Sequence, residues 1–268
     1  MKGKYYYYGE FGFFNVYAIP AIEIFYERNP NEKLEICTYA EYGMILKNHF
    51  PSIEISSIDW VFNESNRQSH YYCDDVIFHE KLKSLGYEKN LQNITDDYES
   101  MKDLKGNHFN ILPPELPIKF SLKRKLEYKA DSLNGEKFIG VLPRKRKSNA
   151  HQLRNMSVEM ANSIFSCLNQ LNYRIVIHGL TEEKQPISGN YIVTTNPLEQ
   201  IMYINNSIFT ICPDSGFGHF VLNCNSDLVI VTSGSDWGWC EIYNPFKNKI
   251  TTLDPYNNFL KNIKSLIV

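Results

Sequence analysis

The segment "TICPDSGFGHFVLN", residues 210–223, places polar residues and glycines between two apolar runs. Asp214 and Ser215 follow a run typical of a buried strand, and the glycines after them permit a sharp turn into a helix. A helix start offers free N–H groups and partial positive charge, which suit a phosphate or a sugar oxygen. His219 lies four residues after Ser215, on the same side of that helix. The predicted ligand site consists of Asp214, Ser215, Gly216 and His219. The alternative is that Asp214 or Ser215 only caps the helix.

A run of four cations, residues 144–147, follows another apolar segment at 137–143. Lysine and arginine at the end of a buried strand can neutralise a diphosphate, and arginine adds a bidentate fork. A solvated surface run is the alternative. A nucleic-acid patch is disfavoured because the formal net charge of the chain is −2. The cations predicted to bind diphosphate are Arg144, Lys145 and Arg146.

Three further strand ends carry candidate residues. Glu10 ends the first predicted strand, and its carboxylate could remove a proton from an attacking hydroxyl; a surface or helix-capping acid is the alternative. His178 and Gly179 end a second strand, and Thr195 ends a third. At these positions we predict contacts with a base or ribose, although a histidine at a strand end is as often structural.

The elements that would position these residues alternate along the chain. The first half predicts strands at 4–10, 33–39 and 52–58, helices at 16–30 and 41–51, an aromatic loop at 11–15, and a strand at 74–79. The second half predicts strands at 137–143, 173–179, 191–195, 207–213 and 227–234, with helices at 156–172, 196–206, 216–225 and 256–268. Ser157 and Asn196 are expected N-caps, with Pro197 in the first helical position. This rhythm predicts parallel sheets with crossover helices, so ligands are expected at the carboxyl ends of the strands.

A proline-rich segment, "NILPPELPIKF" at 110–120, reads as an extended hinge, and residues 121–136 as a charged helical connection. We therefore predict an N-terminal α/β domain at 1–120 and a C-terminal α/β domain at 121–255. A C-terminal helix is expected at 256–268. The fold class is α/β, with two doubly wound Rossmann-type domains that face a cleft.

Composition excludes several classes of protein. The 268 residues are 43% hydrophobic and 22% charged, as in ordinary folded proteins. No apolar run approaches the ~20 residues of a membrane span, and the N-terminus lacks a signal-peptide pattern, so a cytoplasmic protein is expected. The six cysteines are scattered and are predicted to be buried thiols.

The sequence contains no P-loop, no G-x-G-x-x-G, no G-x-S-x-G and no H-E-x-x-H motif, so no cofactor or metal is predicted.

The second half resembles the donor-binding half of GT-B glycosyltransferases, and most closely the bacterial heptosyltransferases of glycosyltransferase family 9. The resemblance rests on "FIGVLPRKRK", "YRIVIHG", "NPLEQIMYINNSIFTICPDSGFGHFVLN" and "DLVIVTSGSDWGW". The family's helix with a leucine and a glutamate matches Leu198 and Glu199. Its strand and Pro-Asp-Ser-Gly turn, with a histidine shortly after, match residues 213–216 and His219.

The resemblance implies transfer of a sugar from a nucleotide-diphosphate donor to a glycan or other hydroxyl acceptor, with inversion and no obligatory metal. It implies that Arg144 and Arg146 bind the donor diphosphate, that the residues at 214–216 and 219 hold phosphate or sugar hydroxyls, and that Glu10 stands where the family has an aspartate. Glu199 joins the residues predicted to contact the base or ribose. Two alternatives remain: a non-catalytic nucleotide- or sugar-binding module, and a nucleotide-sugar epimerase on the same scaffold. No nucleic acid or membrane partner is expected.

Overall fold

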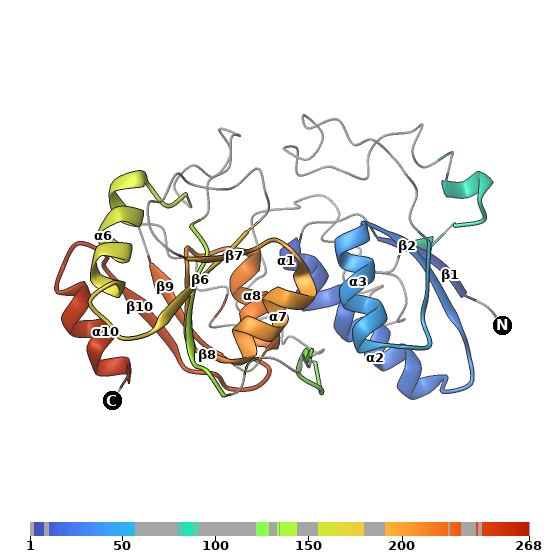
Figure 1. The fold of residues 1–268 in the computed structure, drawn as a ribbon. Helices are drawn as coiled ribbons and strands as arrows, with labels where there is room; N and C mark the ends of the chain where they lie inside the picture. Colours follow the sequence, from blue (N-terminus) through green and yellow to red (C-terminus); the bar gives the residue numbers. More distant parts are fainter. Residues whose placement is uncertain are drawn as a thin grey trace. The chain divides into compact units, whose positions relative to one another are not determined.

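The computed structural model divides the chain into two compact units, Met1–Arg124 and Lys125–Val268 (Figure 1). The structure describes residues 3–7, 11–56, 80, 82–87, 89–90, 122–128, 133, 135–143, 155–179, 191–224, 226–231, 240 and 243–267. No helix within these ranges is long and apolar enough to span a bilayer.

The first unit is built on a parallel sheet with the strand order β3-β2-β1-β4. Its strands are β1 (Gly3–Tyr7), β2 (Leu34–Thr38), β3 (Glu54–Ser56) and β4 (Lys89–Asn90). Its helices are α1 (Phe11–Phe13), a π-helix η1 (Phe14–Ala18), α2 (Ile19–Arg28) and α3 (Ala40–His49). Pro20 lies in the first turn of α2, where its missing N–H costs little.

The second unit contains a six-stranded parallel sheet with the order β10-β9-β8-β5-β6-β7. Its strands are β5 (Phe138–Val141), β6 (Arg174–His178), β7 (Ile192–Thr194), β8 (Ser207–Cys212), β9 (Asp227–Val231) and β10 (Ile250–Leu253). Its helices are α6 (Val158–Leu168), α7 (Pro197–Asn205), α8 (Gly216–Asn223) and α10 (Phe259–Ile267). The chain runs outward from β5 to β7, then returns to β8 on the other side of β5. The direction of winding therefore reverses between β5 and β8.

The two faces of this sheet are covered by different helices (Figure 1). Side chains alternate between the two faces along a strand. On one face, Val141, Ile177 and Ile211 pack in an apolar core with residues of α6 and α10. On the opposite face, Phe138 contacts Tyr203 of α7, with ring centroids 5.2 Å apart. Phe217 of α8 also lies on that face, as its contact with His178 shows. Burial on both faces explains why these strands are continuous apolar runs.

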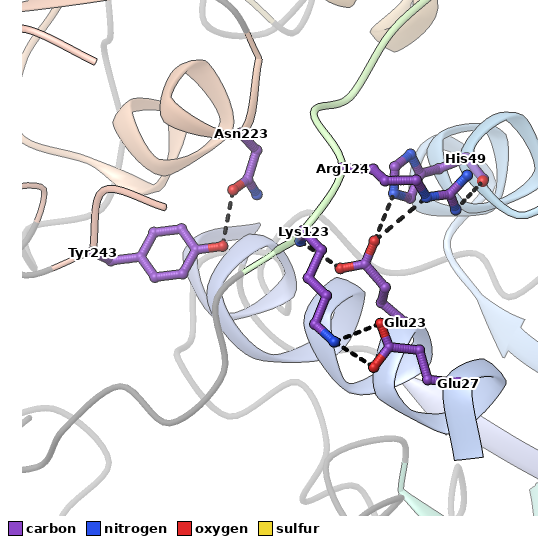
Figure 2. Close-up of polar contacts among 7 residues, drawn as sticks. All are labelled: Glu23, Glu27, His49, Lys123, Arg124, Asn223 and Tyr243. Carbon is purple, nitrogen blue, oxygen red and sulfur yellow. Dashed lines mark hydrogen bonds and ion pairs between the residues drawn. The ribbon is translucent and has the colours of Figure 1, made fainter. Parts of the chain in front are cut away.

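The segment that joins the units is anchored differently at its two ends. In the first unit, the Lys123 N–H donates to Glu23 Oε2 at 2.6 Å, and Arg124 Nε lies 3.5 Å from Glu23 Oε1 (Figure 2). In the second unit, the Leu126 N–H donates to the Asn223 carbonyl at 2.7 Å. The carbonyl of Leu126 accepts a hydrogen bond from the Asn205 side chain at 2.9 Å.

Most predicted elements within the described residues are confirmed, including the caps. Ser157 accepts from the Met160 N–H at 3.0 Å, and Asn196 accepts from the Leu198 N–H at 2.9 Å, with Pro197 opening α7. The two-unit α/β architecture with parallel sheets is confirmed as well. The predicted strand at 74–79 and the hinge at 110–120 lie outside the described residues, and the cleft stays a prediction.

Two predictions about local structure were wrong, and two strands were missed. The aromatic segment 11–15 is not a loop, because α1 and η1 are helical from Phe11 onward. Residues 122–128 are irregular rather than helical. Leu122 and Leu126 have helical spacing and are both buried. The Leu126 N–H, however, donates to the distant Asn223 carbonyl and not to a carbonyl one helical turn earlier. Strands β4 and β10 were not predicted.

Candidate functional site

At the reversal point of the second sheet, the two strands that precede the predicted ligand-binding segments lie side by side. Val141 of β5 pairs with Ile211 of β8, and the Leu142 N–H donates to the Ile211 carbonyl at 2.8 Å. The basic run and the Asp214 turn each begin three residues beyond this pair. In open α/β sheets, ligands bind at the carboxyl ends of the strands where the winding reverses. Arg144, Lys145 and Arg146 themselves lie outside the described residues, so their contacts stay a prediction.

The start of α8 carries a buried hydroxyl that the helix does not use. Ser215 has the extended backbone of an N-cap residue, with φ −159° and ψ 168°, but its side chain makes no capping hydrogen bond. Ser215 is 7% exposed, and its Oγ has no hydrogen-bond partner among the residues that the structure describes. The alternative in which the Ser215 side chain caps the helix is therefore wrong. A buried hydroxyl without a partner is costly, and a ligand oxygen would satisfy it.

Asp214, which precedes Ser215, and His219, four residues after it, are also buried, at 6% and 5% exposed. The Cys240 thiol donates to Asp214 Oδ1 at 3.9 Å. The ring of Tyr243 meets the His219 ring edge-on, with centroids 5.8 Å apart. The turn is thus supported by residues from a later part of the chain.

Tyr243 is itself fixed by the far end of α8, because its hydroxyl donates to Asn223 Oδ1 at 2.9 Å (Figure 2). Sequence reasoning missed Asn223, Cys240 and Tyr243. Cys240 and Tyr243 lie more than twenty residues beyond the motif, in a stretch without helical or strand periodicity, so no local signal could have identified them.

His178 lies beneath α8 rather than at the surface. It is 1% exposed, and its ring centroid is 5.5 Å from that of Phe217. Burial lowers the pKa of His178 to about 3, so the ring is neutral at neutral pH. Neither ring nitrogen has a hydrogen-bond partner among the described residues. The predicted contact of His178 with a base or ribose stays a prediction.

The other residues predicted to contact a base or ribose gather at the carboxyl ends of β6 and β7. The Gly179 N–H donates to the Thr194 carbonyl at 3.3 Å, and the partly exposed Thr195 follows β7 directly. Glu199, which is exposed, accepts a hydrogen bond from the Thr194 hydroxyl at 2.9 Å. The structure therefore places Gly179, Thr195 and Glu199 at one edge, and their role stays a prediction.

Two other predictions remain without a test. Glu10 lies outside the described residues, so its proposed action as a base is a prediction from the sequence. Among the described residues, no three His, Cys, Asp or Glu side chains lie close enough together to hold a metal ion. Independence from metal likewise stays a prediction.

Comparison with known proteins supports the fold through structure alone. No protein-family model and no curated protein sequence matches the chain. The structure is similar to E. coli ADP-heptose lps heptosyltransferase II, with a TM-score of 0.60 and 10% identity over 99% of this chain and 98% of that one. It is also similar to a glycosyl transferase family 9 protein from Veillonella parvula, with a TM-score of 0.57 and 11% identity over 98% and 90% of the two chains.

A protein named for a different activity has a related structure. The chain matches a putative UDP-N-acetylglucosamine 2-epimerase from Listeria monocytogenes with a TM-score of 0.51 and 9% identity, over 100% of this chain and 88% of that one. At such low identity the likeness shows the fold alone. The predicted fold class and the predicted resemblance are confirmed: the chain has a GT-B-like α/β fold similar to that of the heptosyltransferases.

Proposed function

We propose that this protein is a glycosyltransferase that moves a sugar from a nucleotide-diphosphate donor to a hydroxyl-bearing glycan acceptor. The observation that carries the proposal is the buried, unused Ser215 hydroxyl at the start of α8, within the part of the chain described. It lies just beyond the carboxyl end of β8, beside β5, and in the sequence β5 is followed by the basic run. Helix N–H groups and a buried hydroxyl suit phosphate oxygens of a donor.

The proposed mechanism assigns roles to charged residues that were predicted from the sequence. The N-terminus of α8, with Ser215 and the basic run at 144–146, would stabilise the negative charge that develops on the departing nucleoside diphosphate. Glu10 would accept the proton of the attacking hydroxyl. We propose inversion at the anomeric carbon and no requirement for metal. Cytoplasmic location is part of the same proposal, because nucleotide sugars are cytoplasmic substrates in this kind of chemistry.

The first experiment measures nucleotide binding by thermal shift and calorimetry with UDP, GDP and ADP in the presence of EDTA. We expect one of the three to raise the melting temperature of the native protein. Ser215→Ala should weaken that binding by roughly 10- to 100-fold, the effect of losing a hydrogen bond to a charged group, worth ~1.5–3 kcal/mol. The stability of the free protein should not fall, because the hydroxyl has no partner among the described residues to lose.

Ser207→Ala is the matched control from the opposite end of β8. The Ser207 hydroxyl donates to the Tyr203 carbonyl at 2.8 Å, so its removal should lower the free energy of unfolding by about 1 kcal/mol. It should leave nucleotide affinity unchanged. If none of the three nucleotides binds, or if Ser215→Ala lowers stability and not affinity, the proposed donor site is wrong.

An epimerase is the second candidate, favoured by the structural likeness to the Listeria protein. Product analysis separates the two activities. A transferase releases free nucleoside diphosphate and places the sugar on an acceptor, whereas an epimerase changes the configuration of the sugar without moving it to an acceptor. A non-catalytic binding module would bind nucleotide with no turnover before or after Glu10→Gln. The transferase should keep its nucleotide affinity and lose turnover in Glu10→Gln.

A further inference from the structure

Two cysteines of the second unit lie against the same point of α8. Cys212 ends β8, and Cys240 follows β9 in the chain. A Cβ built on Gly218 would lie 2.6 Å from Cys240 Sγ and 3.8 Å from Cys212 Sγ. The separation of the two sulfurs therefore cannot exceed the sum of these distances. Both cysteines are present as thiols, and both side chains are fully buried.

The sheet directs the Cys212 side chain towards α8. Ile211 belongs to the apolar core with α6 and α10, and side chains alternate along a strand, so Cys212 lies on the opposite face. Because residue 218 is a glycine, both sulfurs can lie close to the axis of the helix. Rotation about χ1 moves a cysteine sulfur between staggered positions. Such a rotation is the movement that would bring the two sulfurs to the ~2.05 Å of a disulfide.

A metal site does not account for the pair. The Cys240 thiol donates to Asp214 Oδ1 at 3.9 Å, so its hydrogen is engaged with a carboxylate. Among the residues that the structure describes, no three His, Cys, Asp or Glu side chains are close enough together to hold a metal ion. Two neighbouring thiols without a third ligand are better suited to bond to each other.

We propose that Cys212 and Cys240 form a reversible disulfide when a peroxide oxidises the protein, and that this bond weakens ligand binding at the start of α8. The regulatory effect rests on the proposed donor site, whereas formation of the bond does not. In reducing compartments, disulfides are usually transient and serve catalysis or redox sensing.

The reaction consumes one hydrogen peroxide and both thiols. Cys240 reacts first, because it contacts Asp214 at a turn that is slightly exposed, whereas Cys212 lies on the sheet beneath α8. The Cys240 sulfur attacks one peroxide oxygen, the O–O bond breaks, and a sulfenic acid forms as one water leaves. The Cys212 sulfur then attacks the Cys240 sulfur, the S–O bond breaks, and the hydroxyl leaves as a second water with the Cys212 proton. Two electrons pass from the thiols to the peroxide.

Oxidation removes a donor from the candidate site. A disulfide sulfur carries no hydrogen, so Cys240 can no longer donate to the buried Asp214 carboxylate. The Cys240 sulfur also moves towards Cys212, away from the turn that begins α8. We expect the affinity for nucleoside diphosphate to fall by roughly two- to tenfold, the effect of losing one ordinary hydrogen bond.

Peptide mapping tests the modification site without any nucleotide. The native protein is treated with hydrogen peroxide in the presence of EDTA, blocked with N-ethylmaleimide, digested and analysed by mass spectrometry. We expect a Cys212–Cys240 linkage that dithiothreitol removes, whereas the urea-unfolded protein should give mixed pairings. Cys167, which is partly exposed, reports that the oxidant has acted. The inference is overturned if Cys167 is oxidised and the linkage is absent, or if the linkage is no more frequent in the folded protein.

Calorimetry with the nucleoside diphosphate that binds the reduced protein tests the regulatory effect. Peroxide should lower the affinity of the native protein, and dithiothreitol should restore it. In Cys212→Ala no disulfide can form, so excess peroxide should carry Cys240 on to the sulfinic acid, which dithiothreitol does not reduce. Cys167→Ser is the matched control and should behave like the native protein. Equal recovery of Cys212→Ala and the native protein would show that the linkage does not cause the loss.

The two measurements separate this inference from the proposed function. If the linkage forms but none of the three nucleotides binds the reduced protein, the donor site is wrong and the regulatory role with it, while the modification site stands. If a nucleotide binds but the linkage does not form, the disulfide alone is wrong.

Discussion

At the scale of single residues, His178 shows how a side chain at a strand end can belong to the core. A side chain added at Gly140 would place its Cβ only 2.9 Å from His178 Nε2 and 2.8 Å from the Thr210 hydroxyl. Glycine at position 140 therefore provides the space that the imidazole occupies. Burial lowers the pKa of His178 to about 3. In the unfolded chain the same imidazole becomes protonated near pH 6.5.

This pKa predicts acid sensitivity with a definite sign. The contribution of the neutral His178 ring to the free energy of unfolding is complete above pH 6.5. It is lost as pH falls from 6.5 towards about 3, because in that range only the unfolded chain binds a proton at His178. His178→Leu removes the effect, so its free energy of unfolding should fall less steeply below pH 6.5, by up to about 1.4 kcal/mol per pH unit. Urea unfolding at several pH values measures both slopes. His49, whose pKa is lowered to about 4 by burial and by Arg124, titrates in both proteins and cancels in the difference. Parallel curves for the two proteins would show that His178 is accessible to protons in the folded state.

At the scale of elements, α8 joins the candidate site to the core through close packing. A Cβ at Gly218 would lie 2.6 Å from Cys240 Sγ and 3.4 Å from Leu228 Cδ2. The helix therefore approaches Cys240 more closely than any larger residue allows, whereas the distance to Leu228 of β9 is that of an ordinary contact. Since the Cys240 thiol also contacts Asp214, this packing supports the turn that begins the helix.

A double-mutant cycle tests the packing. Gly218→Ala alone should destabilise the protein by about 1–3 kcal/mol, because the added methyl overpacks the site. In the Cys240→Ala background the thiol is absent, and the same change should be neutral or stabilising by up to about 1 kcal/mol, the helix propensity of alanine over glycine. Chemical denaturation of the four proteins gives the coupling energy. Equal effects in both backgrounds would mean that Cys240 is not the residue that excludes a side chain at position 218.

Elements whose signals are local could be predicted from the sequence. Asn196 and Pro197 mark the start of α7, and the apolar run before Asp214 marks β8, because capping and burial act over a few residues. The helical spacing of Leu122 and Leu126 was misleading, because long-range backbone hydrogen bonds determine the conformation of that segment. The contacts of Tyr243 with α8 and the stacking of Phe11 on Tyr42 join distant parts of the chain. No local pattern encodes these contacts, so they could not be predicted from the sequence.

At the scale of the whole molecule, the chain passes from one unit to the other within very few residues. The Lys123 N–H is bound to Glu23 in the first unit, and the Leu126 N–H is bound to Asn223 in the second. Only Arg124 and Lys125 lie between these two anchors. Glu23 is nearly buried, and the neighbouring His49 is neutral at neutral pH because its pKa is lowered to about 4. Their 3.9 Å approach is therefore not an ion pair, and Arg124 is the cation that the Glu23 carboxylate meets.

Amide hydrogen exchange tests whether the two anchors act independently. Glu23→Ala removes the acceptor of the Lys123 N–H, so exchange at Lys123 should accelerate about tenfold, the equivalent of a hydrogen bond worth roughly 1–1.5 kcal/mol. Exchange at Leu126 should not change, because its acceptor belongs to the second unit. Glu27→Ala is the matched control: Glu27 accepts from the Lys123 ammonium at 2.6 Å on the surface and should leave both amides unchanged. If Glu23→Ala accelerates both amides equally, the connection opens as one body.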